Sequence, residues 1–406
     1  MGRGAHRVAI VGAGPIGLEA ALAAAARGLD FTVYEAAESV GGYVRRWGHV
    51  RAFTPWDMAV SPRARSALAT AGARVPGGDH LPTGDELAAE LLEPLAGLPA
   101  LAGRVRAGTR VTAIGREGLL KHEEIGSPER AARPFRLLLT LPDGSEAIAH
   151  AEMVLDCSGT YGSPNRLGDG GISAIGESGL EDRIERCMPL LEADPGRWAG
   201  RTILLTGSGH SAQTAARDLA RFARDAPETR IIWAIRSRDP TWGAVEDDPL
   251  PDRAALNRAA AEIAGGASPA IETRLGHVTE RLERQDGRIA VTLRNGEAGQ
   301  VIVDRVLALN GGVGDASLYR QLQVHECYAT EGPITLAATL LGSEGGDCLV
   351  QTSAGVDVLR NPEPRFFVLG SKSYGRNNTF LLRIGWEQVA EVFGALDDEL
   401  LAGARH

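Results

Sequence analysis

A glycine-rich turn near the N-terminus, Gly12-Ala13-Gly14-Pro15-Ile16-Gly17, constrains the fold of this chain more than any other stretch. It follows the apolar run Arg7–Val11 and precedes the Ala- and Leu-rich segment Leu18–Arg27, which predicts a buried strand, a turn and a helix. A second apolar run begins at Phe31 and ends at Glu35. A lone GxGxxG is weak evidence, but this one stands in register with strand, helix, second strand and terminal acid.

Each glycine of the turn has its own expected role in holding a dinucleotide. Gly12 allows the tight turn, Gly14 lets a pyrophosphate approach the backbone, and Gly17 lets the helix pack on the strand. The helix N-terminus offers free N–H groups and a positive dipole end to the phosphates. Glu35 is placed to accept hydrogen bonds from a ribose diol. The alternative, a glycine-rich turn that binds nothing, receives little weight.

The same pattern returns about two hundred residues later. A strand is expected at Arg201–Thr206, followed by Gly207-Ser208-Gly209-His210-Ser211-Ala212, a helix to about Arg224 and a strand at Arg230–Ile235. Here Ala212 replaces the third glycine, and Arg236 stands where the first unit has an acid. An arginine at this point suits a 2′-phosphate, so we predict NADPH rather than NADH. The alternative is that Arg236 and Arg238 are solvated charges at the end of a strand.

The length and charge of the chain indicate how many domains it has and which partners it is unsuited to bind. At 406 residues the chain is long enough for two or three domains. The formal net charge of −9 argues against nucleic acid or an anionic membrane as partner, and no apolar run is long enough to predict a membrane span. The basic and apolar start resembles a signal peptide, but Glu19 and the dinucleotide fingerprint explain it better. We therefore expect no targeting segment and a cytoplasmic protein.

The four cysteines are widely spaced and form no CxxC motif, so neither a metal site nor a disulfide framework is expected. This usage fits a reducing compartment. Cys157 ends an apolar strand and is interpreted as a small core residue rather than a nucleophile.

Further elements are predicted from periodicity, capping and turn residues. Helices are expected at residues 83–97 and 253–264, and from near 379 to about 401. Strands are expected at 105–116, 134–141, 148–150, 288–294, 300–309 and 365–369, and at 151–160, where the strand ends in a turn of small residues.

Two dinucleotide fingerprints, the second inserted into the unit of the first, resemble the two-dinucleotide-binding-domain flavoproteins: disulfide reductases, thioredoxin reductases, flavin-containing monooxygenases and Baeyer–Villiger monooxygenases. The resemblance is specific at Gly12–Gly17 with Glu35, at Leu155–Gly159, at Gly207–Ala212 with Arg236, and from Phe366 onward. It implies an α/β fold with two Rossmann-like domains, the NADPH domain inserted into the FAD domain. The implied boundaries are 1–165 and 310–406 for the FAD domain and 166–309 for the NADPH domain.

The departures from these relatives bear on the chemistry. Disulfide reductases carry a redox cysteine pair, which this chain lacks, so dithiol chemistry is excluded. Monooxygenases usually carry a histidine fingerprint between the two nucleotide units, but none lies between His150 and His210. Many relatives end the last FAD strand in Gly-Asp, whereas here it ends in Gly370-Ser371.

The resemblance implies an FAD-dependent oxidoreductase that uses NADPH. The leading hypothesis is a monooxygenase that transfers oxygen from a peroxyflavin to a nitrogen, a sulfur or a carbonyl substrate, with molecular oxygen and a small molecule as partners. One alternative is an NADPH-dependent reductase or oxidase without oxygen insertion. Another is a flavin-binding redox sensor without catalysis, although the intact second fingerprint argues against it. The sequence leaves open whether two copies form a homodimer.

The resemblance also suggests residues near the cofactors. Arg51, Asp57 and His210 are the catalytic candidates. Surface charge is the alternative for Arg51, and Asp57 could pair with an arginine or tune the flavin. Beyond the turns and their strand-end charges, cofactor contacts are expected at these residues: Gly42, Arg45, Trp47, Val111, Gly159, Gly207, Gly209, His210, Ser211, Gly370, Ser371, Asn378 and Thr379.

Overall fold

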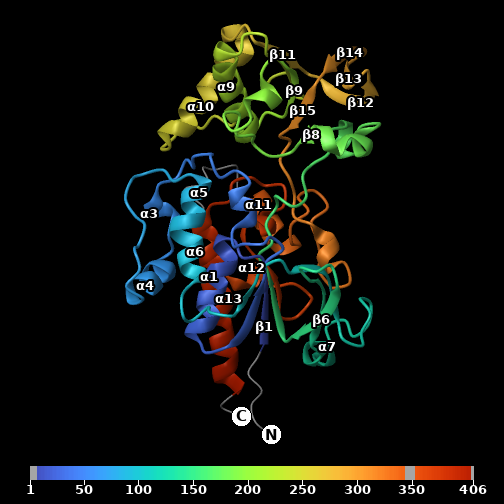
Figure 1. The fold of residues 1–406 in the computed structure, drawn as a ribbon. Helices are drawn as coiled ribbons and strands as arrows, with labels where there is room; N and C mark the ends of the chain where they lie inside the picture. The colour runs from blue at the N-terminus through green and yellow to red at the C-terminus, as the bar shows by residue number, and fades with distance from the viewer. Residues whose placement is uncertain (1–6, 343–352, 404–406) are drawn as a thin grey trace. The chain divides into compact units, whose positions relative to one another are not determined.

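The computed structural model describes residues 7–342 and 353–403, and the chain divides into two compact units (Figure 1). Unit 1 comprises Met1–Ser163 and Val313–His406, and unit 2 comprises Pro164–Gly312. Unit 2 is therefore inserted into unit 1. The predicted boundaries, after residues 165 and 309, stand two and three residues from these divisions. Which cofactor each unit holds stays a prediction.

A five-stranded parallel sheet forms the centre of unit 1. Its strands are β1 (Arg7–Val11), β2 (Asp30–Tyr34), β3 (Val105–Arg106), β7 (Met153–Asp156) and β16 (Phe366–Val368). They lie in the order β16-β7-β1-β2-β3, and all are paired in parallel. β2 lies on one side of β1 and β7 on the other. The carboxyl ends of β1 and β7 therefore form a topological switch point, where sheets of this class bind ligands.

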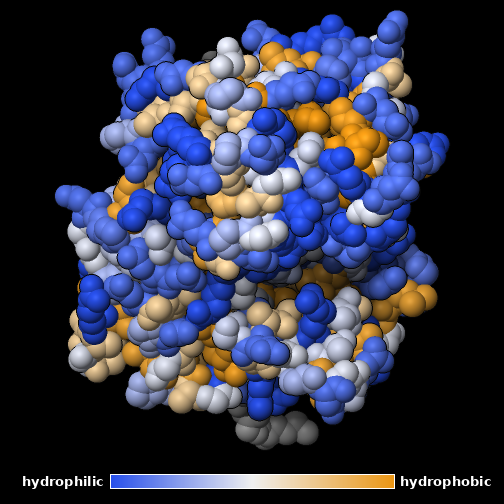
Figure 2. Space-filling model, turned by 45° about the horizontal axis from the view of Figure 1, so that its top comes forward, coloured by the Kyte–Doolittle hydropathy of each residue, from blue (hydrophilic) through white to orange (hydrophobic). Residues whose placement is uncertain are grey.

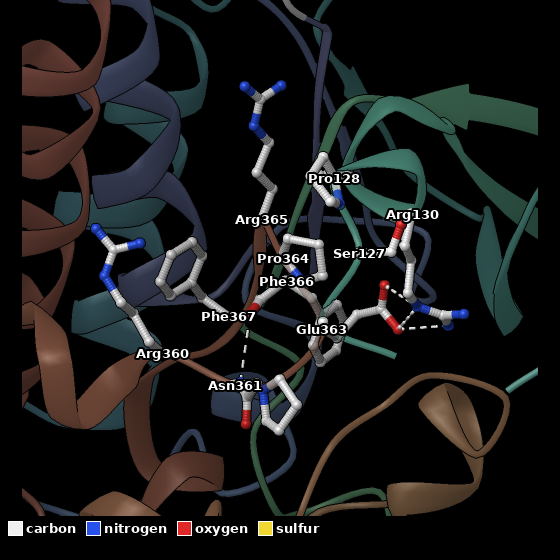
Figure 3. Close-up of a pocket in the computed structure, with 13 residues that line it drawn as sticks. Ser127, Pro128, Arg130, Arg360, Asn361, Glu363, Pro364, Arg365, Phe366 and Phe367 are labelled. Atoms are coloured by element: carbon white, nitrogen blue, oxygen red, sulfur yellow. Dashed lines mark hydrogen bonds and ion pairs between the residues drawn. The ribbon is translucent and has the colours of Figure 1, made fainter. Parts of the chain in front are cut away.

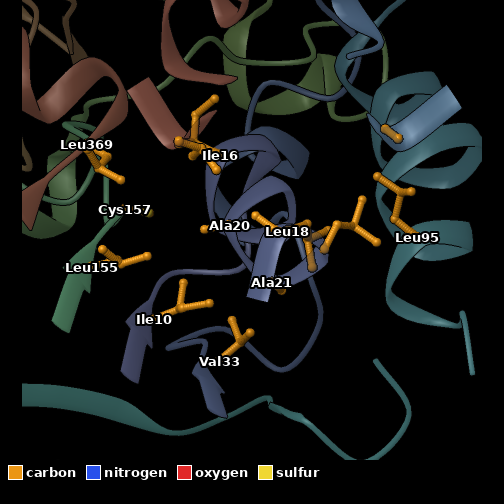
Figure 4. Packing of buried hydrophobic residues seen from close by; sticks show 14 of the residues in the cluster. Ile10, Ile16, Leu18, Ala20, Ala21, Val33, Leu95, Leu155, Cys157 and Leu369 are labelled. Atoms are coloured by element: carbon orange, nitrogen blue, oxygen red, sulfur yellow. The ribbon is translucent and has the colours of Figure 1, made fainter. Parts of the chain in front are cut away.

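β1 is apolar from Val8 to Val11 because both faces of the sheet are covered. Val8 and Ile10 pack against helices, chiefly α1 (Pro15–Ala26) and α13 (Leu382–Gly403). Figure 4 shows Ile10, Val33 and Leu155 packed beside the α1 residues Leu18 and Ala21. Ala9 and Val11, on the opposite face of β1, pack against a second sheet of three antiparallel strands: β4 (Arg110–Arg116), β5 (Phe135–Thr140) and β6 (Glu146–Ala151).

Unit 2 repeats this architecture. Its parallel sheet has the order β11-β10-β9-β15-β8, and a three-stranded antiparallel sheet packs on it through Leu204, Ile232 and Val291. The parallel strands are β8 (Ile184–Glu185), β9 (Thr202–Thr206), β10 (Arg230–Ile235), β11 (Ile271–Leu275) and β15 (Arg305–Ala308). The other elements are α9 (His210–Asp225), α10 (Pro251–Glu262), β12 (Val278–Gln285), β13 (Arg288–Asn295) and β14 (Glu297–Val303). In chain order β9, β10, β11 and β15 correspond to β1, β2, β3 and β7. The predicted fold class, two Rossmann-like units, is confirmed.

Two predicted strands are wrong as continuous strands. Residues 105–116 divide into β3 and β4, and residues 300–309 divide into β14 and β15. At each break the chain passes between the parallel and the antiparallel sheet of its unit. Gly108 stands in the first break and Asp304 in the second, and apolar residues on both sides make each stretch resemble one strand. β11 and β12 were not predicted, because charged residues such as Arg274, Arg281 and Glu283 interrupt their pattern.

The predicted helix at 83–97 is confirmed. Thr83 and Glu86 form a capping box, with Thr83 N–H donating to Glu86 Oε2 at 2.7 Å. The final helix begins at Leu382, three residues later than expected. The remaining segments are α5 (Gly84–Glu86), η1 (Leu87–Leu92), α6 (Glu93–Ala96), α2 (Gly42–Arg45), α3 (Trp56–Ala59), α4 (Pro62–Thr70), α7 (Pro128–Ala132), α8 (Pro195–Trp198), α11 (Ile334–Gly342), α12 (Val356–Leu359), η2 (Asp169–Gly171), η3 (Glu177–Arg183), η4 (Ile263–Ala267), η5 (Ala316–Tyr319) and η6 (Gly370–Tyr374).

Hydrophilic residues cover most of the face drawn in Figure 2, with hydrophobic residues in separate groups between them. Among the described helices, none is both long and apolar enough to cross a membrane.

Candidate functional site

The first glycine turn lies at the switch point of unit 1. Gly12 has a φ of +97°, and a Cβ atom at this position would lie 2.8 Å from the carbonyl oxygen of Cys157. Gly17 packs α1 onto the turn, because a Cβ there would lie 1.9 Å from the oxygen of Gly12. Only glycine fits at either position.

Gly14 differs from its two neighbours in the motif. A Cβ atom on Gly14 would meet no atom within 4 Å, and its φ of −80° is open to any residue. No side chain among the described residues caps α1, which begins at Pro15. The turn thus presents open backbone and uncapped N–H groups, such as those of Ile16, at one place. This is the arrangement that binds a phosphate.

Glu35 follows β2 and holds the turn. Its Oε2 accepts a hydrogen bond from the N–H of Ala13 at 2.7 Å, and its Oε1 accepts one from Ala37 at 2.9 Å. The carboxylate is buried, and each of its oxygens retains a lone pair for a further donor. The predicted contact to a ribose diol stays a prediction, and a second role, in shaping the turn, was not foreseen.

Three further segments meet the turn at this edge. Gly41 donates its N–H to Ala13 at 3.0 Å, and Gly42 leaves no room for a side chain, since a Cβ would lie 2.2 Å from that of Ala37. After β7, Gly159 lies beside Ser371, whose Oγ would be 3.8 Å from an added Cβ. Gly370 has a φ of +73° and packs against Ile16. The structure therefore brings Gly14, Gly42, Gly159, Gly370 and Ser371 to one edge.

A buried ion pair that the sequence analysis missed underlies this edge. Lys372 Nζ lies 2.6 Å from Asp156 Oδ2, and their side chains are 1% and 0% exposed. Lys372 also donates to Ser158 Oγ at 3.1 Å and to the carbonyl of Asp315 at 2.8 Å. The pair joins the ends of β7 and β16 to the segment before η5. Its members stand 216 residues apart, so no local pattern links them.

A second buried network joins the turn after β16 to α13. The side-chain oxygen of Gln388 accepts the N–H of Gly370 at 2.9 Å, and its amide donates to Ser373 Oγ at 3.0 Å. The Ser373 hydroxyl in turn donates to the Gly370 carbonyl at 2.8 Å. The position of Ser371 is thereby determined by hydrogen bonds on both sides of it.

Aromatic side chains gather beside Gly42 and Gly159. Tyr161 stacks on Tyr43 and on Trp47, with ring centroids 6.4 Å apart in each pair. Trp47 Nε1 is buried and has no hydrogen-bond partner among the described residues. A buried donor without a partner is costly, so this N–H offers a hydrogen bond to a bound group.

Several candidates instead have structural partners within unit 1. Arg45 pairs with Glu93 and donates to the Val40 carbonyl, and Arg51 donates to the Leu81 carbonyl at 2.7 Å. Asp57 is 57% exposed and accepts hydrogen bonds from Arg65 and from the N–H of Gly78. None of these contacts reaches the glycine turn, and the roles given to Arg45, Arg51 and Asp57 stay predictions.

Val111, Asn378 and Thr379 are placed differently from the glycines. Val111 lies in β4, within the core between the two sheets of unit 1. Thr379 donates its N–H and its hydroxyl to the side-chain oxygen of Asn377, at 2.9 and 2.7 Å, and the exposed Asn378 lies between them. This turn precedes α13. Contacts of these three residues with a cofactor stay predictions.

The second glycine turn reproduces the geometry of the first. Gly207 has a φ of +106°, and a Cβ there would lie 2.3 Å from the carbonyl oxygen of Leu309, after β15. A Cβ on Gly209 would meet no atom within 4 Å. The helix α9 begins at His210, followed by Ser211, and no side chain among the described residues caps it. Unit 2 thus carries a second open phosphate-binding turn at the carboxyl end of β9.

Two arginines follow β10, and the structure distinguishes them. Arg238 donates from Nη2 to Asn295 Oδ1 at 2.9 Å. The side chain of Arg236 is exposed and makes no hydrogen bond or ion pair with another described residue. Arg236 is therefore the arginine available for a ligand, at the position equivalent to Glu35.

His210 faces the loop of unit 2 that contains Gly243. Its Nε2 lies 3.6 Å from the position of a Cβ on Gly243. Burial, together with the charge of Arg253, lowers the pKa of His210 below its usual 6.5, against the opposing effect of Asp248. Arg253 and Asp248 form a nearly buried pair, Nη2 to Oδ1 at 2.7 Å, which ties this loop to α10. His210 is thus neutral near pH 7.

The described cysteines Cys157, Cys187 and Cys327 form no disulfide with one another, and Cys348 lies outside the described residues. Burial raises the pKa of the Cys157 thiol, and the neighbouring charge of Asp156 raises it further. Cys157 therefore remains a thiol near neutral pH. The described residues contain no group of three or more potential metal ligands.

Comparison with known proteins establishes the fold. Residues 10–61 match the NAD(P)-binding Rossmann-like domain family, and no curated protein sequence matches the chain significantly. The solved structure of bacillithiol disulfide reductase from Bacillus cereus is similar, with a TM-score of 0.68, 18% identity and coverage of 97% of this chain and 99% of that chain.

Two solved monooxygenase structures are similar over equal lengths, each match covering 97% of this chain and 99% of the other. Ornithine N-hydroxylase from Kutzneria sp. 744 has a TM-score of 0.63 and 15% identity. A flavin monooxygenase from Stenotrophomonas maltophilia has a TM-score of 0.58 and 17% identity. At such identities the likeness shows a common fold of reductases and monooxygenases, and it does not select between them.

Proposed function

From the fold that this chain shares with flavoprotein reductases and monooxygenases, we propose that it is an oxidoreductase that binds FAD in unit 1 and NADPH in unit 2. The observation that carries the proposal is the pair of open glycine turns at equivalent edges of two repeated sheets. One turn is followed by Glu35 and the other by Arg236, which suit a ribose diol and a 2′-phosphate respectively.

The residues of unit 1 fit FAD. Gly14 and the uncapped start of α1 bind the pyrophosphate, and Glu35 binds the adenosine ribose. Ser371 takes the place of the acid at the ribityl chain, and the Trp47 N–H has a free hydrogen to donate. When bound, FAD supplies the exchange of hydride and electrons between NADPH and an acceptor.

The residues of unit 2 fit NADPH. Gly209 and the start of α9 bind the pyrophosphate, and Arg236 makes charge-assisted hydrogen bonds to the 2′-phosphate. His210 is neutral and can donate a hydrogen bond at the first turn of α9 without adding charge.

We propose further that the acceptor is molecular oxygen and that the enzyme is a monooxygenase acting on a nitrogen, a sulfur or a carbonyl of a small molecule. The cysteines support this choice: the described ones form no disulfide, and the thiol nearest the turn, Cys157, is buried with a raised pKa. A dithiol relay needs two sulfurs close together and a thiolate. The alternative is an NADPH-dependent reductase or oxidase, since bacillithiol disulfide reductase has the same fold as the monooxygenases.

The experiment is a turnover assay that compares NADPH oxidation, oxygen consumption, peroxide release and product by mass spectrometry. The probes are a primary amine, a thioether and a ketone, each with oxygen. A monooxygenase gives an oxygenated product with at least one probe and little peroxide. If NADPH oxidation is matched by peroxide with every probe, the enzyme is an oxidase. If NADPH reduces an added disulfide without oxygen, it is a reductase.

A further inference from the structure

A cavity of about 370 Å³ lies at the amino edge of the parallel sheet of unit 1 (Figure 3). Its walls are the start of α7, residues 126–131, and the segment 360–367 that leads into β16. The strands are parallel, so their amino ends lie at the edge opposite the glycine turns. The cavity is therefore separate from the proposed cofactor site.

The wall of the cavity carries buried positive charge. Glu363 Oε1 lies 2.7 Å from Arg116 Nε, and its Oε2 lies 2.7 Å from Arg130 Nη2, with all three side chains at most 1% exposed. Glu363 Oε2 also accepts the N–H of Gln323 at 2.8 Å. Two guanidinium groups thus share one carboxylate, which leaves a net charge of +1 inside the protein. Such a charge acts strongly on a nearby ligand, because the interior screens it weakly.

Arg365 adds a further cation to the wall of the cavity. Its side chain is half-buried and makes no hydrogen bond or ion pair with another described residue. Its backbone has a φ of +60°, a left-handed conformation that costs energy in a residue other than glycine. Figure 3 shows the guanidinium groups of Arg360 and Arg365 extending away from the Glu363–Arg130 pair. Arg360 lies 3.6 Å from Asp357.

The rest of the wall is apolar. Pro128, Pro364 and Phe367 line the cavity, and its volume lies within the range of about 300–1,000 Å³ found for small-molecule sites. We propose that this cavity binds a small organic acid, with its carboxylate on Arg365 and its apolar body against the prolines and Phe367. The proposal does not depend on the proposed function, because no residue of the cofactor site lines the cavity.

The test is titration calorimetry of the purified full chain with benzoate as probe. Benzamide serves as the neutral isostere and inorganic phosphate as the anion without an apolar body. We expect benzoate to bind at least about tenfold more tightly than either, because the charge-assisted hydrogen bonds need the carboxylate.

Arg365→Gly is the informative variant. Glycine suits the left-handed φ at this position, so the variant keeps its thermal stability and loses benzoate affinity by about tenfold or more. Arg74→Met is the matched control, since it removes one positive charge at a side chain 80% exposed and outside the cavity. Arg365→Met, which removes the charge and keeps a long side chain, provides a second loss of affinity if Arg365→Gly unfolds.

Four results would overturn the proposal. They are equal binding of benzoate and benzamide, binding of phosphate without benzoate, unchanged benzoate affinity in both cavity variants, and an equal loss of affinity in Arg74→Met.

Discussion

Replacing Lys372 by methionine tests how the candidate FAD edge is held together. Methionine has a similar length but no charge, so the variant leaves the carboxyl group of Asp156 at 0% exposure without its cation, with Ser158 as its remaining partner. Removing one member of a buried ion pair costs about 3–5 kcal/mol, because the other charge is left uncompensated. This is a large part of the about 5–15 kcal/mol that stabilises a typical native protein.

The assay is equilibrium unfolding in urea of the parent, Lys372→Met, Asp156→Asn and the double variant. The double variant loses less stability than the sum of the single losses, because it leaves no buried charge unpaired. Arg284→Met is the exposed control: it breaks the pair with Asp182, whose side chains are 52% and 58% exposed, and it costs less than about 1 kcal/mol. A cost of Lys372→Met no greater than that of this control, or single losses that simply add, would refute the prediction.

Three shorter predictions concern the capping box, the nucleotide preference and the thiols. The hydrogen bond with Thr83 lowers the pKa of Glu86, so this group stabilises the fold above its unfolded pKa and loses that effect as the pH falls through its folded pKa. Glu86→Gln keeps the capping box but lacks the charge, so in urea unfolding it is less stable than the parent at pH 7 and converges with the parent towards pH 3; equal acid sensitivity would contradict this. Arg236→Ala reduces the preference for NADPH over NADH by about tenfold or more, from the ratio of kcat/KM values, and Arg238→Ala reduces it less because Arg238 is bound to Asn295. An unselective parent enzyme would contradict this prediction. Replacing every cysteine by serine or alanine leaves NADPH-driven flavin reduction intact in stopped-flow measurements; loss of turnover in Cys157→Ser with FAD retained would favour a thiol relay.

The glycine turns were predictable because their requirements are local. Gly12 and Gly207 have a positive φ, and Gly14 and Gly209 have open space where a side chain would lie. Glycine is the residue type that meets either requirement, so the sequence alone indicates both. The repeat of strand, turn and helix then identified both units. Gly108 and Asp304 mark the breaks within 105–116 and 300–309. Apolar residues continue on both sides of each break, so the pattern alone does not show that the chain changes sheet there.

The contacts that hold the glycine turns of unit 1 in place join residues that are far apart in the sequence. Lys372 and Asp156 meet across 216 positions, and Gln388 reaches back to Gly370 from α13. No spacing in the sequence signals such pairs. Conversely, Arg45 and Asp57 were selected for their nearness in sequence to Gly42, whereas the structure gives them partners such as Glu93 and Arg65.

The measurement that tests the central claim most directly is the flavin content of purified Gly14→Ala beside Gly209→Ala. Both glycines have a negative φ and space for a methyl group, so neither change strains the protein, and both variants keep the unfolding midpoint of the parent. The methyl group occupies the place of the pyrophosphate. We expect Gly14→Ala to lose most of its FAD, and Gly209→Ala to keep FAD but to be poorly reduced by NADPH. Full flavin content in Gly14→Ala would contradict the assignment of FAD to unit 1.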